Sequence, residues 1–91
     1  MNETIHQHIT DAASLDAWQP RDGYAIATCK ILISSGAYTA WEPRTYEFRR
    51  TAQGAWIIDT NPGILWRDSW EDVVHWFCAM KPVEIDLITT V

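Results

Sequence analysis

The clearest hydrophobic pattern in the chain has the period of a helix and lies between residues 70 and 80. Ser69, with Asp72 three residues later, resembles a capping box, and acidic side chains in the first turn complement the helix dipole. Pro82 ends the pattern, because proline lacks an N–H and disfavours α backbone in the residue before it. The pattern predicts a short amphipathic helix whose apolar stripe consists of Trp70, Val73, Val74, Phe77 and Met80.

A weaker pattern of the same period lies near the start of the chain. Ile5, Ile9, Ala12 and Ala13 share one face if residues 3–18 are helical. Proline cannot continue a helix, and Pro20 follows this segment closely. The sequence therefore predicts an N-terminal helix.

A period of two predicts strands in the middle of the chain. Residues 24–34 alternate, and Ser35-Gly36 is typical of a tight hairpin turn. A second strand is expected over 37–51, with an interruption at Pro43, and a third over 55–60. The first of these strands has one continuous apolar face, formed by Ala25, Ala27, Cys29, Ile31 and Ile33.

Alternation returns in residues 83–91, which are predicted to form a last strand. No linker, repeat or low-complexity segment divides the chain, so residues 1–91 are interpreted as a single small α+β domain. The expected order is an N-terminal helix, a three-stranded antiparallel meander, one amphipathic helix and a C-terminal strand. Both helices are expected to pack on one face of the sheet.

Composition and charge limit the classes of partner and the cellular compartment that we expect for this chain. The net charge is −5, from 12 acidic and 7 basic residues, which disfavours direct binding to nucleic acid and favours a basic protein partner. No apolar run approaches the roughly 20 residues that span a bilayer, and the first residues do not resemble a signal peptide. We therefore expect a cytoplasmic protein that does not bind membranes. Cys29 and Cys78 are expected to be free buried thiols, with a disulfide between them as the less favoured alternative.

Catalytic patterns in the sequence are weak. His75 and Cys78 lie three apart on the predicted helix, but a thiol beside an apolar stripe is more typical of a structural cysteine than of a nucleophile. The acidic group Asp68, Glu71 and Asp72 is explained by helix capping and by the helix dipole. Metal-ligand spacings and phosphate-binding glycine motifs are absent from the sequence. We expect no enzyme, no cofactor and no metal site.

Tryptophan is the most informative feature, because six in 91 residues exceed what one small core easily buries. Exposed Trp and Met are enriched at the centres of protein interfaces. Nearby carboxylates would steer a basic partner. The predicted partner-binding residues are Trp76, Met80, Trp41, Trp66, Asp68, Glu71 and Asp72.

These observations favour a non-enzymatic protein-binding domain, with a small acidic inhibitor of a nucleic-acid-binding surface as the specific hypothesis. In size, charge and expected element order the chain is similar to phage anti-defence proteins, including anti-CRISPR proteins, and to nuclease immunity proteins. Two alternatives remain open. One is a homodimeric structural or interaction protein closed by the tryptophan patch. The other is a single-stranded RNA-binding module that uses Arg44, Tyr46, Phe48, Arg49 and Arg50.

Overall fold

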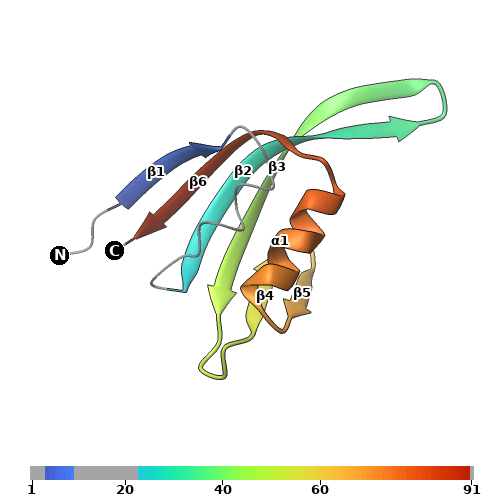
Figure 1. Ribbon diagram of the computed structural model, residues 1–91. Helices are drawn as coiled ribbons and strands as arrows, with labels where there is room; N and C mark the ends of the chain where they lie inside the picture. Colours follow the sequence, from blue (N-terminus) through green and yellow to red (C-terminus); the bar gives the residue numbers. More distant parts are fainter. Residues whose placement is uncertain (1–3, 10–22, 91) are drawn as a thin grey trace.

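The computed structural model describes residues 4–9 and 23–90, which form one antiparallel sheet and one helix (Figure 1). The sheet has six strands in the order β1-β6-β2-β3-β4-β5. All neighbouring strands run antiparallel. The elements are β1 (Thr4–Ile9), β2 (Tyr24–Ser35), β3 (Tyr38–Arg50), β4 (Trp56–Asp59), β5 (Ile64–Arg67), α1 (Trp70–Ala79) and β6 (Val83–Thr90).

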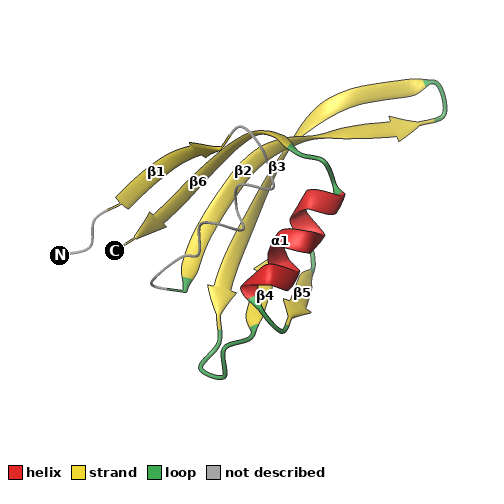
Figure 2. Ribbon diagram, in the orientation of Figure 1, coloured by secondary structure: helices red, strands yellow, loops and turns green. Residues whose placement is uncertain are grey.

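The predicted amphipathic helix is confirmed as α1. The Ser69 hydroxyl oxygen accepts a hydrogen bond of 3.2 Å from the Asp72 amide, which satisfies one of the unpaired N–H groups of the first turn. The apolar stripe is buried at Trp70, Val73, Val74 and Phe77. Figure 2 shows α1 lying across one face of the sheet, so a single helix covers that face among the described residues.

Aromatic rings form the centre of the core between α1 and the sheet. Phe48 and Trp56 are fully buried, and Trp70 is 5% exposed. The Trp56 and Trp70 ring centroids lie 4.8 Å apart, and Phe48 meets Trp70 edge-on at 5.7 Å. Such tilted and edge-to-face contacts are the favoured geometries for aromatic pairs. Two of the six tryptophans therefore stabilise the fold rather than a binding surface.

The expected N-terminal helix is wrong where the structure describes it. Residues 4–9 form β1, an edge strand paired with β6, and residues 10–22 lie outside the described residues. Ile5 and Ile9 fit both periods, since they are four apart on a helix and on the same side of a strand. The edge of β6 supplies a long-range partner that a local pattern cannot reveal.

The three-stranded meander is also wrong. Strands β2, β3, β4 and β5 follow one another in the sheet, so the antiparallel run has one strand more than predicted. The missed strand, β5, has only four residues and pairs Trp66 with Ile57 and Ile64 with Asp59. The proposed packing of several helices on the sheet is corrected as well, because α1 is the one helix among the described residues.

The expected interruption at Pro43 does not occur, and β3 runs continuously from Tyr38 to Arg50. Strand β4 pairs only with residues 47–50 of β3, so Pro43 faces a partner strand on one side only, opposite Lys30 of β2. Edge strands tolerate proline, because a residue paired on one side only can turn its nitrogen away from the partner strand. The two strands continue beyond the rest of the sheet as a long hairpin (Figure 1).

Candidate interaction surface

Alternation along the strands gives the sheet a second face, opposite α1. Cross-strand register brings its side chains into rows: Tyr24 lies opposite Arg49, Arg49 opposite Ile57, and Ile57 opposite Trp66. We call this surface the helix-free face. It is formed by Tyr24, Ile26, Thr28, Lys30 and Leu32 of β2, Trp41, Pro43, Thr45, Glu47 and Arg49 of β3, Ile57 and Asp59 of β4, Ile64 and Trp66 of β5, and Asp86 and Ile88 of β6.

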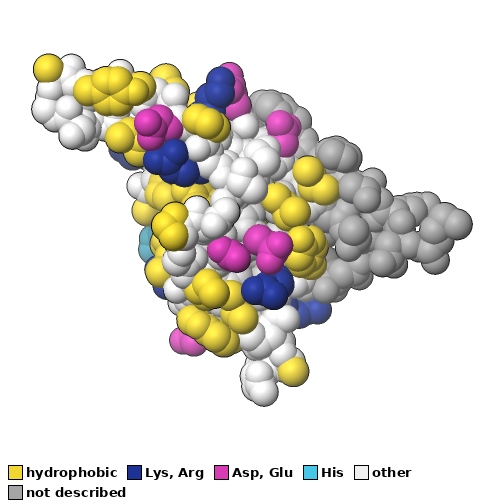
Figure 3. Space-filling model, turned by 180° about the vertical axis from the view of Figure 1, so that it is seen from behind, with side chains coloured by type: hydrophobic (Ala, Val, Ile, Leu, Met, Phe, Trp, Pro, Cys, Tyr) yellow, Lys and Arg dark blue, Asp and Glu magenta, His cyan; other side chains and the backbone are white. Residues whose placement is uncertain are grey.

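Large apolar side chains are exposed on the helix-free face. Trp66 is 59% exposed, Ile64 57%, Trp41 50% and Leu32 48%. Trp41 and Leu32 are direct cross-strand neighbours in the long hairpin. Figure 3, which views the molecule from this side, shows hydrophobic, acidic and basic side chains intermixed over it. Clustered exposed apolar side chains with charged neighbours are typical of interaction sites.

A pair of carboxylates stands in the middle of this face. Glu47 of β3 lies directly opposite Asp59 of β4. The Tyr24 hydroxyl donates a hydrogen bond of 3.0 Å to Glu47, and the Arg49 Nε atom lies 3.1 Å from the other Glu47 oxygen. The Asp59 carboxylate accepts a hydrogen bond of 3.0 Å from the Asn61 amide. Among the residues that the structure describes, no basic side chain pairs with Asp59.

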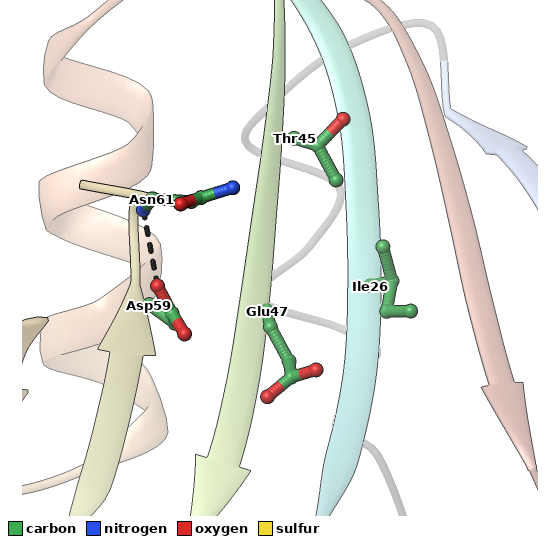
Figure 4. A pocket seen from close by; sticks show the side chains of 5 residues that line it. All are labelled: Ile26, Thr45, Glu47, Asp59 and Asn61. Carbon is green, nitrogen blue, oxygen red and sulfur yellow. Dashed lines mark hydrogen bonds between the residues drawn. The ribbon is translucent and has the colours of Figure 1, made fainter. Parts of the chain in front are cut away.

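The two carboxylates line an open pocket of about 370 Å³. Its lining is completed by side chains of β2, β3 and the turn after β4 (Figure 4): Ile26, Thr45 and Asn61. Partial burial raises the pKa of Tyr24, and its hydrogen bond to Glu47 raises it further, so this hydroxyl remains a proton donor to the carboxylate. The pocket therefore combines two carboxylates with the apolar side chain of Ile26.

Replacing Asp59 with Asn is expected to stabilise the fold by about 0.2–1 kcal/mol, because like charges directly opposite each other in a sheet are unfavourable. The Asn oxygen can still accept the Asn61 amide hydrogen bond. Urea unfolding at neutral pH and low salt measures the change. Glu47→Gln is the matched control, and we expect no gain from it because it also removes the ion pair with Arg49. A loss of stability in Asp59→Asn would contradict the repulsion.

The structure does not bring together all the predicted partner-binding residues. Trp76 is half-buried with its ring edge-on to Tyr46 at 5.2 Å, and the Met80 sulfur lies 3.6 Å from the Tyr46 hydroxyl that donates to it. Both side chains pack against the core on the helix side. Trp41 and Trp66 belong to the helix-free face, on the other side of the sheet. The predicted patch is therefore divided between two surfaces.

The predicted acidic residues lie at the start of α1. Asp68, Glu71 and Asp72 are all exposed there. The acids that share a face with Trp41 and Trp66 are instead Glu47 and Asp59, which the sequence prediction did not include. Alternation over residues 55–60 puts Ile57 and Asp59 on the strand face opposite Trp56 and Ile58, and this pattern is the sequence signal that identifies Asp59.

The aromatic residues predicted for RNA stacking are inside the molecule. Tyr46 is 5% exposed and Phe48 is fully buried, so neither presents a ring to a base. The arginines are divided between the two faces and have local contacts. Arg44 pairs with Glu42 at 3.0 Å, Arg49 pairs with Glu47, and Arg50 lies over the Trp56 ring at 5.9 Å. This geometry gives no support to the RNA-binding alternative.

Neither Cys29 nor Cys78 forms a disulfide in the structure. Cys29 is buried, and burial raises its pKa to about 11, although the positive charge of Arg44 acts in the opposite direction. At pH 8 the thiolate of Cys29 is therefore scarce, and the thiolate is the reactive form.

Alkylation tests this environment. At pH 8 we expect iodoacetamide to modify Cys29 about 100-fold more slowly in the native protein than in the guanidinium-unfolded chain, because the raised pKa lowers the thiolate fraction by about that factor. A Cys78→Ser variant isolates the reaction, and mass spectrometry of timed samples measures it. Equal rates in native and unfolded protein would show that Cys29 is accessible.

The described residues contain no group of three or more His, Cys, Asp or Glu side chains arranged to hold a metal ion. Within the same part of the chain, no helix has the length and apolar character needed to cross a membrane. No protein-family model, curated protein or solved structure matches the sequence or the fold. The geometry of the chain therefore carries the functional argument alone.

Proposed function

We propose that this chain is a non-enzymatic protein-binding domain that contacts its partner through the helix-free face of the sheet. One observation carries the proposal: Trp66 and Trp41, which are half exposed or more, lie on the sheet face that α1 leaves uncovered. Tryptophan is strongly enriched among the residues that dominate binding energies at protein interfaces. Leu32 and Ile64 extend the apolar surface.

We further propose that the domain acts as a small acidic inhibitor that covers a basic, nucleic-acid-binding surface of its partner, in a reducing cytoplasm. The net charge of −5 and the carboxylates on the helix-free face support this part of the proposal. The absence of a disulfide at Cys29 and Cys78 is consistent with a reducing compartment. The charge also opposes direct contact with a phosphate backbone.

The homodimer is the second candidate, favoured by the same exposed tryptophans. A symmetric dimer closed by this face would bring two copies of the Glu47 and Asp59 carboxylates to one interface, which charge repulsion disfavours where they approach each other. Sedimentation velocity at micromolar concentrations separates the two candidates. We expect a monomer, and a stable dimer that dissociates on Trp66→Ala substitution would favour self-association instead.

Site-specific photocrosslinking tests the proposed surface directly. The photoreactive residue p-benzoylphenylalanine replaces Trp66 in one variant and Glu71, exposed on α1, in the matched control. Both variants are expressed in the source cells and irradiated, and crosslinked products are identified by mass spectrometry. We expect a defined protein crosslinked from position 66 and not from position 71. The reverse pattern would place the contact on the helix side and overturn the proposal.

A further inference from the structure

We propose that the helix-free face takes a partner segment carrying a lysine or arginine side chain beside an apolar one, with the cationic group seated between Glu47 and Asp59. This inference rests on the proposed protein-binding function and names the chemistry of the partner at that surface. The apolar side chain of the partner segment would pack on Ile64, which lies directly opposite Asp59, and on Trp66.

The charges of the helix-free face indicate the sign of the charge that the partner carries at this site. Lys30 and Arg49 are its basic side chains, and each pairs with an acid: Lys30 with Glu84 at 2.8 Å and Arg49 with Glu47 at 3.1 Å. Asp59 has no such cation among the described residues. The pocket between Glu47 and Asp59 therefore keeps a net negative charge, which complements a cation on the partner.

The shape of the pocket favours a long side chain over a bare ion. Its volume of about 370 Å³ is open to solvent, and Ile26 gives it an apolar wall beside the two carboxylates. Lysine and arginine have apolar stems that pack on such walls while the charged head meets a carboxylate. Trp66 and Ile64 give the neighbouring apolar side chain a surface that is more than half exposed.

The placement of Glu47 directly opposite Asp59 in the sheet fits this role. Like charges opposite each other weaken a sheet, and a bound cation would convert the repulsion into two attractive interactions. A second copy of this chain presents the same acids, and its cations on this face, Lys30 and Arg49, are each already paired with an acid. The favoured occupant is a different, basic protein.

The experiment uses capped pentapeptides and the full-length, ¹⁵N-labelled protein. The probe has the sequence threonine-valine-lysine-valine-threonine, and norleucine replaces lysine in its neutral counterpart. Titration at low salt is followed by amide chemical shifts. We expect saturable shifts at amides of β3, β4 and β5 with the lysine peptide, and binding about fivefold weaker with the norleucine peptide.

Protein variants separate local from general electrostatics. Asp59→Asn is expected to weaken binding of the lysine peptide by about three- to fivefold. Asp68→Asn removes the same charge at the exposed start of α1 and is expected to leave the affinity unchanged. Equal losses in the two variants would overturn the inference, as would shifts located away from these strands or no shifts at millimolar peptide.

The outcomes distinguish this inference from the proposed function. If the norleucine and lysine peptides bind the helix-free face equally, the cation is not recognised, while the face itself still binds protein segments. If photocrosslinking from position 66 succeeds and the lysine peptide does not bind, only the present inference fails. Failure of both experiments removes the proposed function as well.

Discussion

Replacing Trp56 with Ala is expected to lower the free energy of unfolding by about 3–5 kcal/mol, a large share of the total stability of a domain of this size. The side chain is fully buried, packs on Trp70 at 4.8 Å, and lies beneath the Arg50 guanidinium at 5.9 Å. Truncation removes the transfer energy of the ring and leaves a cavity that the surrounding strands fill only partly.

Urea unfolding followed by far-UV circular dichroism measures this loss. The matched control is Trp66→Ala, which removes the same atoms from a position 59% exposed to solvent and should change stability by no more than about 0.5 kcal/mol. Similar losses in both variants would contradict the division of tryptophans between core and surface. A loss below about 1 kcal/mol for Trp56→Ala would show that this core is loosely packed.

The successes of sequence-based prediction follow from local signals. Helix α1 has an N-cap, an apolar stripe and a terminating proline within one segment. Its start, its buried face and its end are therefore determined by residues close together in the sequence. The same holds for β2, where buried and more exposed residues alternate over residues 24–32 and leave no competing helical period. Strand β6 was likewise predicted from alternation after Pro82.

The failures have one physical cause, which is pairing between distant segments. Strand β1 exists because β6 offers an edge, and β5 exists because β4 does. Neither partner is visible in a local window, and segments of four or six residues with two or three apolar positions fit several structures. The helical interpretation of residues 4–9 was therefore consistent with their pattern and still wrong.

The candidate surface was only partly predictable for the same reason. The sequence indicates that tryptophans exceed what the core needs, but which of them are exposed depends on the face that α1 covers. Trp76 lies at the margin of the helical stripe, and its ring packs edge-on against Tyr46 at the border of the core. Trp66 lies in the strand that the sequence did not predict, so its exposure became visible only with the sheet assembled.

Replacing Trp66 with Ala is expected to weaken binding of the crosslinked partner by about 30-fold or more, equivalent to about 2 kcal/mol, while the fold stays intact. An exposed indole at the centre of an interface contributes a large apolar area and loses little conformational freedom on binding. Titration calorimetry with the purified partner measures the affinity, and circular dichroism confirms that the variant is folded.

The control for this prediction is Glu71→Ala, an exposed acid at the start of α1 that was part of the patch predicted from the sequence. If the helix-free face is the contact surface, this variant binds with nearly wild-type affinity, since its side chain lies on the opposite side of the sheet. A loss in Glu71→Ala with none in Trp66→Ala would assign the interface to α1 and its acids. The pair of variants therefore decides between the two sides of one small sheet, because the sheet separates them and each substitution changes only one.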